Sequence, residues 1–142
     1  MSTTTVALAV VAMGIIALAD LSTKQSAGKI SPSLGTLIYA VTTIVIPLVW
    51  TLWTRAHGGL QITRDGVLWS IAVGISFSIF TGLMFLLFSQ GVNLSIGSPI
   101  VRMGGIVIAA TLGIIVFREG LNLQYLIGFL LATAGIFLVV TR

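Results

Sequence analysis

Long apolar runs, separated by short polar stretches, occupy nearly the whole chain. They predict helices at about residues 4–27, 34–53, 67–89, 96–117 and 121–140. A bilayer core of about 30 Å is crossed by about 20 apolar residues in a helix, whereas a barrel strand alternates over about 10 residues. The pattern therefore predicts an all-α integral membrane bundle of five transmembrane helices, formed by residues 1–142 as a single domain in the lipid bilayer.

The first two predicted helices carry the clearest local signals. No positive charge precedes the apolar run 6–19, which favours a retained helix over a secretory signal peptide. We expect this helix to continue through Asp20 and Lys24 and to stop before Gly28, a residue type common at helix C-termini. In the second helix Pro47 lies mid-span, which membrane helices tolerate where neighbouring helices satisfy the freed carbonyl group.

Polar and aromatic residues indicate where the predicted helices leave the membrane. The one long polar stretch runs from Arg55 to Gly66, and Trp50, Trp53 and Trp69 lie beside it. Tryptophan near a helix end usually marks the headgroup region. We interpret these three side chains as interface anchors, with a cation-binding aromatic cage as the alternative.

Small residues recur at intervals of three or four along three of the predicted helices. The trios are Gly74, Ser78 and Gly82; Gly105, Ala109 and Gly113; and Gly128, Ala132 and Gly135. Each trio stays near one helix face, where small side chains let two backbones approach closely. The favoured interpretation is tight packing within the chain. Contact between two copies of the chain and a substrate path are the alternatives.

The composition excludes a water-soluble globule. The 142 residues are 57% hydrophobic and 7% charged, with a mean hydropathy of +1.17, whereas soluble domains carry about 25% charged residues. The net charge of +4 comes from basic residues scattered singly along the chain. Nucleic-acid binding needs a clustered basic face, so no nucleic-acid partner is expected.

Residues that support catalysis or metal binding are scarce. The chain has no cysteine, and its single histidine is His57, so neither a thiolate site nor a multi-histidine metal site is expected. The sequence has no cluster of nucleophile, histidine and carboxylate to run a reaction. It therefore predicts a protein that is not an enzyme and that needs no metal or cofactor.

Basic residues in the loops give no preferred orientation. With five crossings, one side of the membrane holds Arg55, Arg64 and Arg118, and the other holds Lys24, Lys29 and Arg142. An excess of Lys and Arg normally keeps a loop on the cytoplasmic side. A tie predicts insertion both ways and a homodimer with an inverted copy. The alternative is that other features fix a single orientation.

Two charged residues are predicted inside the membrane. Asp20 and Arg102 lie at similar depths, about 9 Å from the same side at 1.5 Å per residue. Ionisable residues at such depths are costly and mark functional sites by default. We expect the two to pair and to line or gate a substrate path. The alternatives are a surface pair of Asp20 with Lys24 and snorkelling of Arg102 to the interface.

Polar residues of the third predicted helix also favour a wet path. They are Ser70, Ser76, Ser78, Thr81, Ser89 and Gln90. We assign Ser78, Gln90 and Tyr39 of the second helix as candidate path residues. Glu119, beside Arg118, is expected in a solvated turn.

Several stretches resemble one family. They are Ala-Leu-Ala-Asp-Leu-Ser-Thr-Lys at 17–24, Ser-Pro-Ser-Leu-Gly-Thr at 31–36, Gly-Val-Asn-Leu-Ser-Ile-Gly-Ser-Pro at 91–99, and Phe-Arg-Glu-Gly-Leu-Asn-Leu-Gln-Tyr-Leu-Ile-Gly-Phe-Leu-Leu-Ala-Thr-Ala-Gly-Ile at 117–136. The chain resembles the drug/metabolite transporter superfamily, and more narrowly a single five-helix EamA domain of the bacterial and archaeal kind. The most specific part is Glu119, followed by Leu121, Gly128 and Gly135.

The resemblance implies transport. Two-domain relatives fuse two inverted halves around a central cavity, so a lone half is expected to dimerise, and inverted repeats with a midplane site recur among transporters. The distantly similar small multidrug resistance proteins embed a glutamate in the first helix. Alignment on Lys24 places Ile16 there, with Asp20 one turn later. The arginine common in the second helix of EamA domains is missing, and Tyr39 lies near its position.

Two functional hypotheses follow. The first is a secondary transporter of a small metabolite or amphipathic compound, which works by alternating access as a homodimer of inverted halves in a prokaryotic plasma membrane. The second is a non-transporting membrane subunit that pairs with another half-transporter or membrane assembly.

Overall fold

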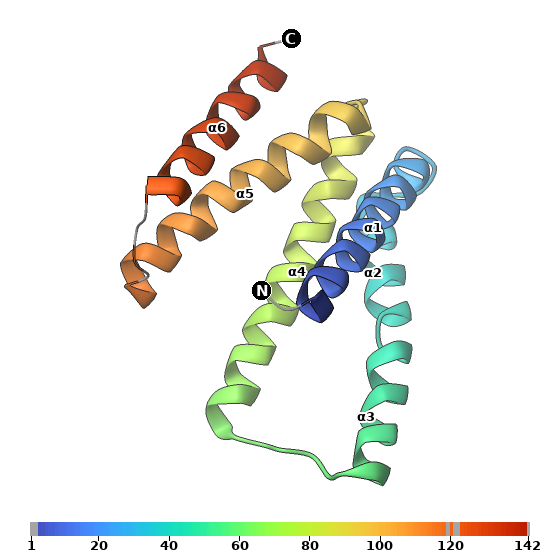
Figure 1. Ribbon diagram of the computed structural model, residues 1–142. Helices are drawn as coiled ribbons and strands as arrows, with labels where there is room; N and C mark the ends of the chain where they lie inside the picture. Colours follow the sequence, from blue (N-terminus) through green and yellow to red (C-terminus); the bar gives the residue numbers. More distant parts are fainter. Residues whose placement is uncertain (1–2, 119, 121–122, 142) are drawn as a thin grey trace. The chain divides into compact units, whose positions relative to one another are not determined.

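The described part of the chain is helical throughout. The computed structural model describes residues 3–118, 120 and 123–141, apart from the side chains of residues 125, 136, 139 and 140. The helices are α1 (Thr3–Ser26), α2 (Pro32–Thr42), α3 (Val45–His57), α4 (Arg64–Ser89), α5 (Leu94–Phe117) and α6 (Leu123–Val140) (Figure 1). Extended pairing among these residues is limited to an isolated bridge between Ala27 and Ile30. The all-α prediction is confirmed for this part of the chain.

The chain divides into two compact units, and each is described by itself. Unit 1, Met1–Gly91, contains α1 to α4, and unit 2, Val92–Arg142, contains α5 and α6. Within the described residues four stretches are long and apolar enough to cross a membrane. They are Thr3–Ser26, Pro32–His57, Arg64–Ser89 and Leu94–Phe117. The fifth predicted span starts in residues outside the description. α6 covers Leu123–Val140, and the apolar stretch Leu126–Gly135 within it is bounded on both sides by residues whose side chains are not described.

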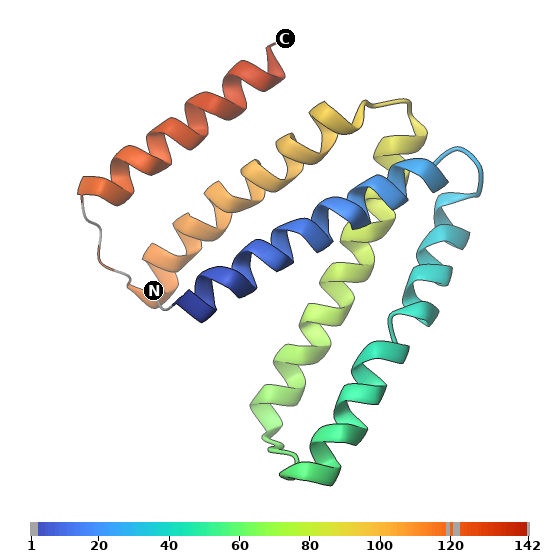
Figure 2. The ribbon, with the colours of Figure 1, turned by 45° about the vertical axis from the view of Figure 1, so that its right-hand side comes forward.

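The second predicted span is two helices instead of one. The regular helical ladder ends at the bond from the Thr43 amide to the Tyr39 carbonyl (2.9 Å) and resumes at the bond from the Leu48 amide to the Ile44 carbonyl (3.0 Å). Pro47 causes the interruption, because it has no N–H for the Thr43 carbonyl and its ring crowds that group. Figure 2 shows the chain leaving one helix at the end of α2 and entering the next at α3.

The helices beside the polar loop extend further into it than hydrophobicity predicts. α3 ends at His57 and α4 begins at Arg64, beyond the expected limits at residues 53 and 67. Thr63 caps α4, because its hydroxyl accepts a hydrogen bond of 3.2 Å from the Gly66 amide. The polar loop is therefore 58–63, which is shorter than the stretch identified in the sequence.

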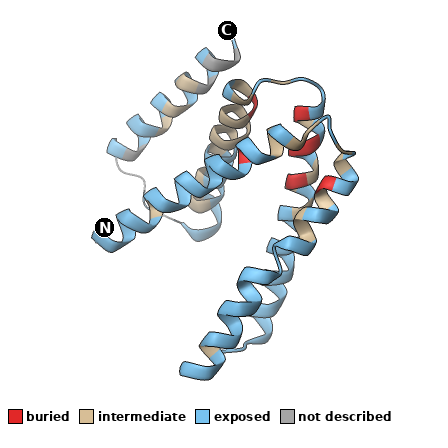
Figure 3. Cartoon of the chain, turned by 90° about the vertical axis from the view of Figure 1, so that its right-hand side faces the viewer, coloured by how far each residue is buried: buried red, intermediate tan, exposed pale blue. Residues whose placement is uncertain are grey.

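Packing in unit 1 is concentrated at one end. α4 packs against α1 and α2, and its buried apolar residues, Met84, Phe85 and Phe88, all lie in its C-terminal half. Residues 64–77 of α4 are exposed, and so is every residue of α3 except Thr54. Figure 3 shows α3 almost entirely in pale blue. Apolar surface exposed to this extent marks contact with a membrane or with another protein.

Unit 2 consists of α5 packed against α6. A Cβ atom added to Gly135 of α6 would lie 3.6 Å from the methyl carbon of Met103 on α5, which is ordinary van der Waals contact. Arg118 follows α5 in the left-handed conformation, with φ of 53°. Gly135 therefore lies at a contact between the two helices, whereas Glu119, Leu121 and Arg142 fall outside the described residues.

Candidate functional site

α2 and α4 are in close contact at two glycines. A Cβ atom on Gly35 would lie 2.8 Å from two carbons of the Phe85 ring, closer than real side chains come. A Cβ atom on Gly82 would lie 3.3 Å from the Thr36 hydroxyl oxygen. The two helices run antiparallel, so residues further along α2 meet residues earlier on α4. Gly35 and Gly82 allow this contact because they have no side chain.

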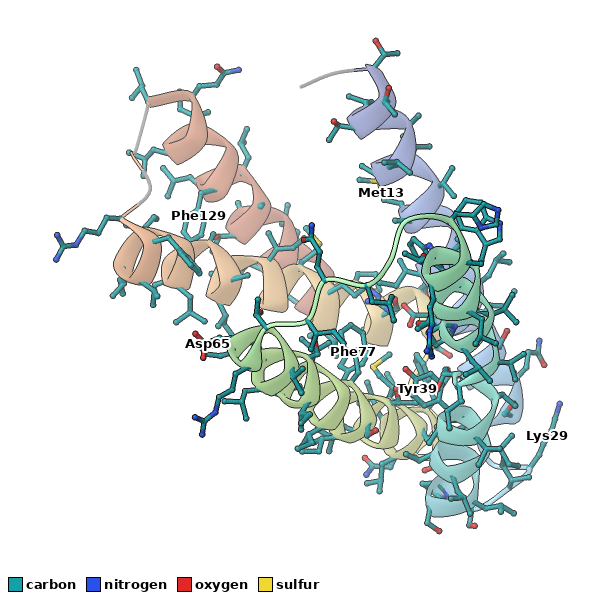
Figure 4. The ribbon with its side chains drawn as sticks, turned by 90° about the horizontal axis from the view of Figure 1, so that it is seen from below. Met13, Lys29, Tyr39, Asp65, Phe77 and Phe129 are labelled. Carbon is teal, nitrogen blue, oxygen red and sulfur yellow. The ribbon has the colours of Figure 1, made fainter. Side chains whose placement is uncertain are left out.

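A groove runs between α2 and α4. It has a volume of about 570 Å³, and its lining residues are Pro32, Ser33, Thr36, Leu37, Ala40, Ser78, Gly82 and Leu86. Ser78, a predicted path residue, therefore lies on the groove. Tyr39 is half-buried and lies on the side of α2 that faces α4 (Figure 4). Small side chains form most of the lining, which leaves room for a ligand or for another helix.

The packed end of unit 1 contains a carboxylate. Asp20 on α1 is only 5% exposed. One turn later, the Lys24 ammonium lies 5.5 Å from the centroid of the Phe88 ring on α4, which is a cation–π contact. α1 and α4 run in the same direction (Figure 1). Asp20, four residues before Lys24, is therefore about level with Met84, four residues before Phe88.

The part of α4 at this level is mainly apolar. Thr81, Met84 and Phe85 are all buried, and Thr81 contributes a hydroxyl group. Charges interact strongly in surroundings of low dielectric, because little solvent screens them. Asp20 is thus an acidic group held within the mainly apolar packed end of unit 1.

The predicted partner of Asp20 lies in the other unit. Arg102 is half-buried on α5, within unit 2, whereas Asp20 belongs to unit 1. The ion pair between them stays a prediction. Gln90, the remaining predicted path residue, is exposed just after α4, and its backbone amide donates to the Leu86 carbonyl at 3.3 Å.

The predicted packing glycines have two kinds of surroundings. Gly82 and Gly135 contact a neighbouring helix, as described above. A Cβ atom on Gly74, Gly105 or Gly128 would meet no heavy atom within 4 Å. Gly113 is half-buried on α5. The three open glycines leave smooth stretches of α4, α5 and α6 against which another helix could pack.

Sequence reasoning missed two features of this region. Gly35 belongs to no small-residue trio, so the spacing of small residues gave no signal of its close contact with Phe85. The break between α2 and α3 did have a signal, since Pro47 removes the bond to the Thr43 carbonyl. The sequence could not predict whether a neighbouring helix would satisfy the Thr43 carbonyl, because that depends on how the helices pack.

The described residues contain no group of three or more His, Cys, Asp or Glu side chains that could hold a metal ion. Comparison of the chain with protein-family models, with curated proteins and with solved structures finds no match. Its function is therefore inferred from its own residues.

Proposed function

We propose that the chain is a half-transporter of the drug/metabolite transporter type, with five membrane crossings. It moves a small metabolite or amphipathic compound by alternating access, as a homodimer of inverted halves in a prokaryotic plasma membrane. The observation that carries the proposal is the burial of Asp20 in a helix long and apolar enough to cross a membrane. Ionisable groups in such helices mark ion and substrate paths.

The groove between α2 and α4 supports the same proposal. Its volume of about 570 Å³ lies within the range of about 300–1,000 Å³ typical of small-molecule sites. The groove is open on one side, and we propose that a second copy of the chain completes it. The tie between loop charges favours a copy inserted in the opposite orientation.

A second candidate is a membrane subunit that does not itself transport. The open glycines Gly74, Gly105 and Gly128 favour it, because smooth helix faces also suit packing against a different half-transporter. In that case the chain alone would form neither a dimer nor a path.

The experiment that separates these candidates is uptake into liposomes that contain the purified chain, with a panel of small cationic, anionic and neutral compounds. We expect uptake of at least one compound above that of protein-free liposomes, and loss of that uptake in Asp20→Asn. The matched control is Asp65→Asn, since Asp65 is exposed in the first turn of α4. Equal uptake by Asp20→Asn and the unmodified chain would contradict the proposal.

A further inference from the structure

The break between α2 and α3 lies near the middle of a membrane-length span. Pro32–His57 forms one apolar stretch of 26 residues. Thr43 is 11 residues after its start and Ile44 is 13 residues before its end, which corresponds to about 17 Å and about 20 Å of helix. The interruption of the ladder therefore falls near the bilayer midplane.

The break presents hydrogen-bond acceptors. The carbonyl groups of residues 41–43 lie between the last bond of α2 and the first bond of α3, where the regular ladder is interrupted. The Thr43 hydroxyl donates its hydrogen to the Ala40 carbonyl at 3.0 Å. The Thr42 hydroxyl donates to the Ile38 carbonyl at 2.9 Å. Because these hydrogens are used within α2, the hydroxyl oxygens can only accept further bonds.

Packing within unit 1 leaves the break between α2 and α3 exposed. Residues 41–45 are all exposed. Ala40 on α2 and Ser78 on α4 both line the groove, so the antiparallel register brings the break about level with Gly74, one turn before Ser78. A Cβ atom on Gly74 would meet no heavy atom within 4 Å. The close contact between α2 and α4 therefore ends where the helix breaks.

Lipid cannot satisfy the backbone groups of a broken helix. Thr43 and Ile44 keep right-handed helical dihedrals, so the break is a proline kink, and the carbonyl groups that it frees must be satisfied by a neighbouring helix, a Ser or Thr side chain, or water. In transporters, carbonyl groups freed by broken helices near the midplane bind cations. We propose that the break at residues 41–44 lines the water-filled part of the transport path and binds a cation, or a cationic group of the cargo, through its carbonyl and threonine oxygens. The inference rests on the proposed function and names the binding segment and the ligand charge.

The test is the reactivity of a thiol placed at the break. The chain has no cysteine, so Thr43→Cys carries a single reactive group. Its matched control is Val49→Cys, an exposed apolar position within regular α3. Each full-length variant is reconstituted in phosphatidylcholine vesicles. It is treated on both sides with a cationic trimethylammonium thiosulfonate or an anionic sulfonate thiosulfonate of similar size.

We expect Thr43→Cys to react with the cationic reagent at least about tenfold faster than Val49→Cys, a difference of about 1.4 kcal/mol. The preference for the cationic over the anionic reagent should exceed that of the same variant unfolded in dodecyl sulfate. If Thr43→Cys fails to fold, Val41→Cys takes its place. Equal rates at the break and at residue 49 would overturn the wet path, and a preference for the anionic reagent would overturn the cation site.

Repairing the helix gives a second readout. Pro47→Ala restores an N–H for the Thr43 carbonyl, so reactivity of the thiol at residue 43 should fall toward that at residue 49. Pro99→Ala is the control, because Pro99 also lies inside a helix but belongs to α5 of the other unit and not to the groove. Fast reaction that persists in Pro47→Ala would contradict the assigned cause. Uptake by the unmodified chain in the same vesicles tests the transport proposal separately, so uptake with an unreactive break would overturn this inference alone.

Discussion

The two halves of α4 differ sharply in packing although both are strongly apolar. The C-terminal half holds the buried residues Thr81, Met84, Phe85 and Phe88, against α1 and α2. The N-terminal half, residues 64–77, is exposed throughout, and α3 beside it in sequence is almost entirely exposed as well. Hydrophobicity alone therefore does not decide where the helices of this unit pack.

Backbone features explain the difference between the halves. At the packed end Gly35 lets the Phe85 ring reach the backbone of α2, and Gly82 lets the Thr36 side chain reach the backbone of α4. At the open end Pro47 interrupts the helix before α3, and Gly74 meets no neighbour. Small residues let helices in a membrane approach closely, and Gly35 and Gly82 at the packed end are the ones that meet a neighbouring helix.

The largest expected effect on the free energy of unfolding comes from removing the Phe88 ring at the packed end. Phe88 is 2% exposed, whereas Phe77, on the open half of the same helix, is 52% exposed. Phe88→Ala should lower the unfolding free energy by about 3 kcal/mol, because it leaves a cavity and removes the ring under Lys24. Phe77→Ala should have a much smaller effect. Unfolding in dodecyl sulfate mixtures, followed by circular dichroism, measures both, and equal losses would show that the two halves do not differ.

Filling the glycine contacts should have the next largest effect. Gly35→Leu forces a side chain against the Phe85 ring and should destabilise the chain by about 1–3 kcal/mol, the usual range for overpacking. Gly74→Leu adds the same side chain where unit 1 has open space. Thermal unfolding of the two variants compares them directly. A Gly74→Leu loss as large as that of Gly35→Leu would mean that the open end is also packed in the assembled protein.

The predicted ion pair joins Asp20 at the packed end of unit 1 to Arg102 in unit 2, and mutation tests whether the pair forms. If Asp20 and Arg102 pair, a double-mutant cycle with Asp20→Asn and Arg102→Gln should give a coupling free energy of about 0.5–3 kcal/mol. Removing one partner should cost more than removing both, since a lone buried charge is left behind. Thermal stability and liposome uptake both report on the cycle. Additive losses would show that the two residues act independently, as expected if Arg102 snorkels to the interface.

The smallest expected effect concerns the cation–π contact. Lys24→Met keeps an unbranched side chain and removes the charge over the Phe88 ring, which should cost about 0.5–1 kcal/mol. Lys29→Met, in the loop after α1, is the control and should have no measurable effect. Unfolding in dodecyl sulfate mixtures measures the stability of both variants. A stability gain in Lys24→Met would show that the ammonium is unfavourable at this end.

The sequence predicts the helices well and their packing poorly, for physical reasons. Long apolar runs identify α1, α4 and α5 because a membrane span requires a minimum length. Thr63 is a residue type suited to an N-cap and so indicates the start of α4. The prediction started this helix at residue 67 because the apolar run begins there. The burial of Asp20 and the closeness of Gly35 to Phe85 depend on which helices become neighbours, and no local rule supplies that.

The proposed transport depends most on the inverted pair, because a half-transporter needs a second half to enclose a path. Ile62→Cys places the only thiol of the chain in the loop 58–63. Intact cells are treated with a membrane-impermeant maleimide, and the labelled fraction is compared with that after permeabilisation. We expect about half of the chains to be labelled before permeabilisation, because loop charges that fix no orientation let the chain insert both ways. Labelling of nearly all or nearly none of the chains would contradict the inverted pair.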